Sequence, residues 1–69
     1  MSDSVYKVIE IIGTSKDSWE KAALVAVERA NKSLRDLRVA EVVQQDLVIE
    51  DGKIEAYRTK LRVSFKFEA

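Results

Sequence analysis

Hydrophobic and polar side chains alternate most regularly along residues 54–67 of the chain. Positions 57, 59, 61, 63, 65 and 67 carry apolar or aromatic side chains or threonine, whereas the positions between them are mostly charged or small. Because successive side chains of a strand point to opposite faces, this pattern predicts a strand over residues 54–67. Its odd-numbered face is expected to pack on the rest of the domain.

A different pattern, with apolar residues three or four positions apart, extends to about Leu34 and predicts an amphipathic helix. Ser15 or Asp17 is expected to cap its N-terminus, because Asp17 and Glu20 have the spacing of a capping box. Trp19 is expected to serve in core or interface packing, since an aromatic residue at helical spacing is usually buried. The apolar positions, several of them alanines that allow a close approach to a sheet, are Trp19, Ala22, Ala23, Ala26, Val27, Ala30 and Leu34.

Two further segments rich in Val and Ile, residues 5–12 and 39–49, predict strands. Gly13-Thr14-Ser15 is expected to end the first of them. Between the second and the alternating strand stands Asp51-Gly52, a strong hairpin signal because a type I′ turn needs positive φ. The order of these elements predicts an α+β fold, β-α-β-β, in which one helix packs on one face of a three-stranded antiparallel sheet.

The composition indicates a single domain, residues 1–69, that is stabilised by other copies of itself. Apolar residues make up 46% of the chain, more than one helix and three strands can hide, and small domains usually need additional support. The chain contains no cysteine and no histidine, so disulfides and the common zinc sites are excluded. The sheet face away from the helix is expected to be a mixed, interface-like surface of Arg58, Lys60 and Arg62 beside Ile9, Ile11, Ala40 and Val42.

Charge and residue inventory exclude several functions. Twelve basic and twelve acidic residues cancel, so no long-range field attracts nucleic acid, despite a basic stripe in the last strand. No apolar run is long enough for a membrane span or a signal peptide, so we expect a soluble cytoplasmic protein. No spacing pairs a nucleophile with a base, and no glycine-rich phosphate loop is present. The chain is therefore not expected to be an enzyme.

Three blocks of the sequence resemble the dodecins, a family of small bacterial and archaeal proteins. The blocks are Gly13-Thr14-Ser15, residues 34–43 and residues 57–65, and their order and spacing match from about Val5 to Phe67. The resemblance implies a hollow homododecamer. Most members bind flavins, so the resemblance also implies that FMN or riboflavin binds at twofold subunit interfaces. The implied role is storage of the flavin rather than its turnover.

Two positions depart from the flavin-binding pattern of that family. Val39 stands where those members carry a tryptophan that stacks on the flavin, and Arg58 stands where they carry a glutamine that hydrogen-bonds its edge. Glu41 and Gln45 keep the polar lining that the resemblance implies. Arg58 can reach a phosphate better than glutamine can, or it can pair with Glu41, Glu10 or Asp46.

The alternative function is a dodecin-type assembly that has lost flavin binding and is a structural or calcium-binding shell. Asp46, Glu50 and Asp51 form an acidic group near the predicted hairpin. Calcium takes six to eight oxygen ligands, so copies that meet on a symmetry axis would have to supply them together. The other interpretation of these residues is that they are solvated carboxylates of a turn.

Overall fold

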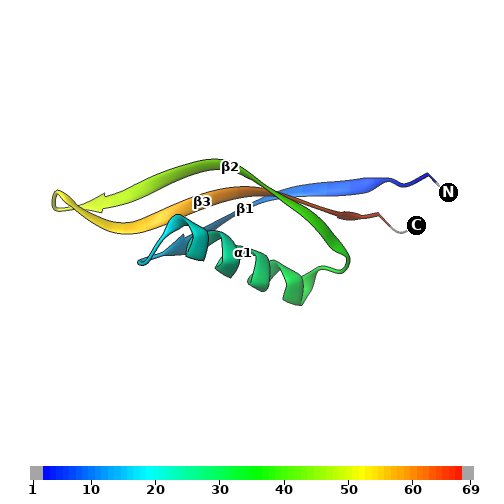
Figure 1. Cartoon of the computed structure of the whole chain (residues 1–69), viewed down its shortest axis with the longest axis horizontal. Helices are drawn as coiled ribbons and strands as arrows, with labels where there is room; N and C mark the ends of the chain where they lie inside the picture. Colours follow the sequence, from blue (N-terminus) through cyan, green and yellow to red (C-terminus); the bar gives the residue numbers. More distant parts are fainter. Residues whose placement is uncertain (1–2, 68–69) are drawn as a thin grey trace.

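The fold is described here from a computed structural model, which covers residues 3–67. One helix packs on one face of a three-stranded antiparallel sheet, as the sequence predicts (Figure 1). The strand order is β1-β3-β2, so that β3 is central. The elements in chain order are β1 (Tyr6–Ser15), α1 (Trp19–Ser33), β2 (Leu37–Glu50) and β3 (Lys53–Lys66).

Strand β1 continues through Gly13 to Ser15, so the predicted break at Gly13-Thr14-Ser15 is wrong. Gly13 remains in register opposite Thr59. A Cβ atom at Gly13 would lie 2.0 Å from the carbonyl oxygen of Ala22, because α1 crosses the strand at this point. The glycine is therefore needed for the close approach of the helix to the sheet and not for a turn.

The N-terminus of α1 is capped by Ser18, so the prediction of Ser15 or Asp17 as the cap is wrong. The Ser18 Oγ accepts a hydrogen bond from the backbone N–H of Lys21 at 3.0 Å, which satisfies one of the free donors of the first turn. The Ser15 Oγ instead accepts from the N–H of Asp17 at 2.9 Å. Ser15 thus stabilises the turn that leads from β1 into the helix.

The β2–β3 hairpin has the turn that its Asp-Gly pair predicts. Asp51 has φ 53° and Gly52 has φ 75°, the positive values that a type I′ turn requires at both central positions. Glu50 and Lys53 flank the turn as paired residues.

The core lies between α1 and the odd-numbered face of β3. Leu61 and Val63 are each only 1% exposed, and Thr59 beside them is fully buried. Ala22 and Ala26 of the helix and Gly13 of β1 are also buried. The predicted inward face of β3 is confirmed, but its core contains only four buried apolar residues within the described part of the chain.

The strand register corrects the predicted composition of the open sheet face, the face that α1 does not cover. Ile9 and Ala40 both pair with Val63, and Ile11 and Val42 both pair with Leu61. Paired residues share a face, so all four lie on the helix side, and the prediction that they lie beside Arg58, Lys60 and Arg62 is wrong. The β1 residues on the open face are instead Tyr6, Val8, Glu10, Ile12 and Thr14.

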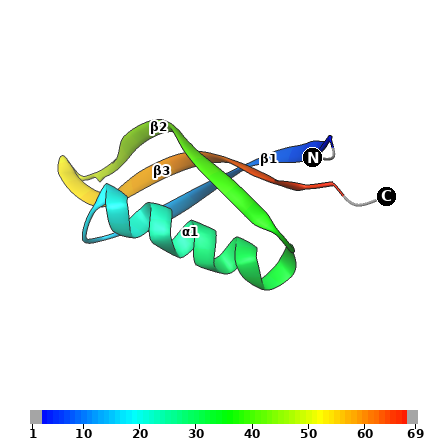
Figure 2. The ribbon, with the colours of Figure 1, turned by 45° about the vertical axis from the view of Figure 1, so that its right-hand side comes forward.

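Helix α1 lies mainly over β1 and β3, and much of β2 is left uncovered (Figure 2). Val42 is accordingly half exposed although it is on the helix side of the sheet. Among residues 3–67, no helix is long and apolar enough to cross a membrane.

The two glycines allow a matched test of this packing. Gly13→Ala should destabilise the fold by about 1–3 kcal/mol, because the added methyl group overlaps a backbone carbonyl that cannot move away alone. Gly52→Ala meets no atom within 4 Å and should cost only the roughly 1–2 kcal/mol of a left-handed backbone. Thermal unfolding midpoints of both variants check this. Equal stability of Gly13→Ala and the wild type would contradict the close helix approach.

Candidate functional site

The strongest polar contact of the open face joins Arg58 of β3 to Asp46 of β2. The Arg58 Nε and Nη2 donate to the two carboxylate oxygens of Asp46 at 2.7 and 2.8 Å. The two residues are direct cross-strand partners, so the strand register itself places them for this bidentate contact. Asp46 was one of the three partners that the sequence suggested for Arg58.

This contact shifts the acidity of both groups. The hydrogen bond and the charge of Arg58 hold the pKa of the Asp46 carboxyl below its ordinary value, although partial desolvation opposes the shift. The hydrogen bond and the charge of Asp46 in turn raise the pKa of Arg58. Both side chains keep about a third or more of their surface in solvent, which moderates the strength of the pair.

The main chain at Asp46 is also fixed from the other side of the sheet. The indole Nε1 of Trp19 donates to the carbonyl oxygen of Asp46 at 3.0 Å, and the Thr59 Oγ1 donates to the carbonyl of Trp19 at 2.8 Å. The Trp19 ring meets Tyr57 edge-on, with ring centroids 5.1 Å apart. Trp19 therefore has the packing role that its spacing predicts. Its bond to Asp46 was missed because a main-chain acceptor leaves no signal in the sequence.

A second charge network crosses the open face toward the other end of the sheet. Arg62 of β3 reaches Glu10 of β1 at 3.0 Å and Glu41 of β2 at 3.7 Å, while Lys60 lies 4.0 Å from Glu10. These side chains are largely exposed, so each pair contributes little stability. Their arrangement gives the open face alternating positive and negative charges.

Three of the four residues expected around a flavin share the open face, and the fourth does not. Val39 pairs with Ser64, Glu41 with Arg62, and Arg58 with Asp46. Gln45 pairs with the buried Thr59, so it lies on the helix side. A register shift between Val42 and Gln44 changes which face the following residues occupy.

Val39 and Arg58 are also far apart within one chain. Ser64, the partner of Val39, is six residues from Arg58 along β3, a separation of about 20 Å at strand spacing. Val39 is 62% exposed and presents an aliphatic side chain with no ring to stack on a planar ligand. Val39 and Arg58 of one chain therefore do not form a single compact site.

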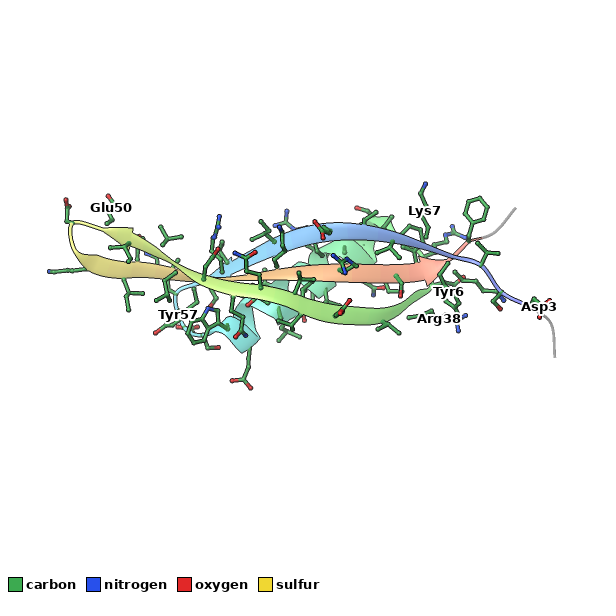
Figure 3. The ribbon with its side chains drawn as sticks, turned by 90° about the horizontal axis from the view of Figure 1, so that it is seen from above. Asp3, Tyr6, Lys7, Arg38, Glu50 and Tyr57 are labelled. Atoms are coloured by element: carbon green, nitrogen blue, oxygen red, sulfur yellow. The ribbon has the colours of Figure 1, made fainter. Side chains whose placement is uncertain are left out.

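The three predicted cation ligands are not assembled within one chain. Asp46 is engaged by Arg58, whereas Glu50 and Asp51 are exposed at the hairpin turn. Figure 3, which looks onto the open face, shows Glu50 at the tip of the hairpin, beyond Tyr57. Across residues 3–67, no group of three or more metal-binding side chains is placed to hold an ion.

The fold and the sequence define the class of protein. Residues 5–68 match the family model described as Dodecin, and the chain belongs to the dodecin family. Members of this family form oligomeric shells and are binding or storage proteins rather than enzymes. The expected family membership and fold are thereby confirmed.

Two characterised relatives are similar to this chain over most of their length. It is 61% identical to the calcium dodecin of Mycobacterium tuberculosis over 64 residues, 91% of this chain and 89% of that protein. The dodecin of Thermus thermophilus is 38% identical over 64 residues, 93% of each chain.

Solved dodecin structures have the same fold as this chain. The crystal structure of the Mycobacterium tuberculosis calcium dodecin, described as having a novel calcium-binding site, matches with a TM-score of 0.84 and 59% identity, covering 94% of this chain and 93% of that one. The Streptomyces coelicolor dodecin matches with a TM-score of 0.92 and 39% identity, covering 100% and 99%.

The pair of Asp46 and Arg58 predicts a specific dependence of stability on pH. Because the pKa of Asp46 is lowered in the folded state, its contribution is present above the unfolded pKa and is lost as the pH falls through the folded one. Asp46→Asn should therefore be less stable than the wild type at neutral pH, and the difference should shrink in acid. Thermal unfolding of both proteins across this range measures it, with Glu28→Gln on the exposed helix face as the control. A difference that stays constant with pH would contradict the assignment.

Proposed function

We propose that this chain forms a non-enzymatic homododecameric shell that binds calcium, and not flavin, between its copies. The observation that carries this proposal is the bidentate contact of Asp46 with Arg58, at the position where flavin-binding members are expected to use glutamine. Two of the guanidinium donors are already used, so a flavin would have to break an ion pair to gain a hydrogen bond.

The loss of the stacking group weakens the flavin interpretation further. An aromatic stacking pair contributes roughly 0.5–1.5 kcal/mol beyond the area that it buries. At a twofold interface both copies would lack the ring, because each presents Val39. Flavin storage, the first function that the sequence suggested, is therefore the weaker candidate for this chain.

Calcium as the ligand is supported by the relative with 61% identity, which is a calcium dodecin. Since one chain offers no assembled cation site among its described residues, we infer that the protein oxygens among the six to eight that calcium takes come from several copies. Glu50 and Asp51 are the proposed ligands that form no salt bridge within residues 3–67. Asp46 can join them only if Arg58 is displaced.

Self-assembly is supported by the apolar surface that one chain leaves exposed. Residues of all three strands and of the helix contribute to it, and the buried core is small. A domain of this size rarely folds stably on so few buried residues without support from partners. The large apolar residues that are at least half exposed are Val5, Val8, Ile12, Leu24, Val39, Val42, Ile49, Ile54 and Phe67.

Titration of the chelator-treated oligomer separates the two ligands. Calcium should give a saturable heat of binding by calorimetry, whereas riboflavin and FMN should show no quenching of their fluorescence at micromolar protein. The double variant Glu50→Gln/Asp51→Asn should bind calcium at least tenfold more weakly, because two carboxylate ligands per copy are lost. The matched control Asp17→Asn/Glu20→Gln, at the helix start, should bind as the wild type does. Flavin quenching without calcium binding would contradict the proposal.

Restoring the missing groups should restore flavin binding. Val39→Trp combined with Arg58→Gln supplies the ring and removes the paired guanidinium, and should strengthen flavin affinity about tenfold or more. Val42→Trp is the control, since Val42 lies on the same strand but on the opposite face. Fluorescence quenching of riboflavin measures both variants. Equal quenching by the two would show that position 39 does not face a planar-ligand site.

A further inference from the structure

The sheet is longer than the helix that covers it. Strands β2 and β3 have 14 residues each, about 46 Å, whereas the 15 residues of α1 span only about 22 Å. The helix begins at Trp19, whose ring contacts Tyr57 of β3. The hairpin residues beyond this contact, 47–56, form an arm that extends past the start of α1 (Figures 1 and 2).

The arm has an apolar surface and no cover within its own chain. Ile49 is 65% exposed and Ile54 is 57% exposed, and these two residues are paired across the ribbon. Leu47 at the base of the arm is also exposed. An isolated two-stranded ribbon is at best marginally stable in water, so an arm of this kind requires a surface to pack against.

A groove of matching character lies on the other side of the domain, between α1 and the edge strand β1. Its walls are mainly apolar and include Ile11, Val25, Ala30 and Leu34. The arm of the same chain points away from this groove, because β2 and β3 carry it past the opposite end of the helix (Figure 2). A groove and an arm that cannot meet within one chain can meet between two copies.

The charges of the two surfaces also favour a contact between the arm of one copy and the groove of another. Arg29 is the one charged residue that lines the groove, and it makes no ion pair within residues 3–67. The arm contains three acidic residues and one lysine, a net charge of 1 − 3 = −2. A negatively charged arm with apolar flanks thus complements an apolar groove with a single unpaired cation. The charged residues of the arm are Glu50, Asp51, Lys53 and Glu55.

We propose that the arm of one copy lies in the groove between α1 and β1 of the next copy. The contact joins two different surfaces, so it is head-to-tail and closes into a ring when the rotation between copies allows it. This inference rests on the proposed self-assembly and specifies how the copies interlock.

Cysteine cross-linking tests the contact directly, because the natural chain contains no cysteine. The double variant Val25→Cys/Ile54→Cys has one thiol in the groove and one on the arm, both at exposed positions. Treatment of the oligomer with a short bismaleimide should link chains into dimers and higher multiples on a denaturing gel. The Val25→Cys single variant should remain unlinked, because a head-to-tail contact does not bring two grooves together. The double variant should be linked more than the Ile54→Cys single variant.

The matched control is Ile54→Cys/Glu20→Cys, whose second thiol lies on the exposed first turn of α1, outside the groove. It should be linked no more than Ile54→Cys alone. Absence of links in Val25→Cys/Ile54→Cys, or linking of that variant no greater than in Ile54→Cys alone or in the control, would overturn the arm-in-groove contact. Light scattering of the untreated variants separates this result from the proposed assembly. An intact oligomer without links refutes only the contact, whereas a folded monomer refutes the shell itself.

Discussion

The structure depends on one constraint, which is that a single short helix must cover a sheet about twice its length. The helix solves part of this problem by lying very close to the sheet, with alanines on its inner side and Gly13 beneath Ala22. This contact buries Leu61 and Val63 but leaves β2 and the hairpin uncovered. Since apolar surface exposed to water costs roughly 25 cal/mol per Å², covering the rest of the sheet is favourable, and we propose that other copies provide the cover. The uncovered sheet thus gives a physical reason for the oligomeric shells that the family forms.

The polar contacts of the sheet follow from the same geometry. Trp19 begins the helix, and its indole holds the main chain of Asp46 from the covered side while Arg58 holds the carboxylate from the open side. Arg58, which stands in place of the expected flavin-binding glutamine, therefore contacts the same residue that anchors the start of the helix. The carboxylate oxygens at the hairpin are hard ligands of the kind that calcium takes, and for this reason we propose calcium rather than a planar aromatic ligand.

Local patterns in the sequence were sufficient to predict the elements and their order. The alternation in β3 and the helical spacing from Trp19 to Leu34 each report a single element, and the Asp51-Gly52 turn needs only its own backbone. The resemblance in three sequence blocks gave the family, which the comparisons confirm.

The errors arose where one element depends on another. Gly13 resembles a strand break until the helix above it is known, and the face that Ile9 occupies depends on the pairing register. The most direct test of the account is the mass of the native protein by size-exclusion chromatography with light scattering, over a dilution series. The account predicts a mass near twelve chains and loss of folded structure whenever the assembly dissociates. A folded monomer that persists at low concentration would contradict it.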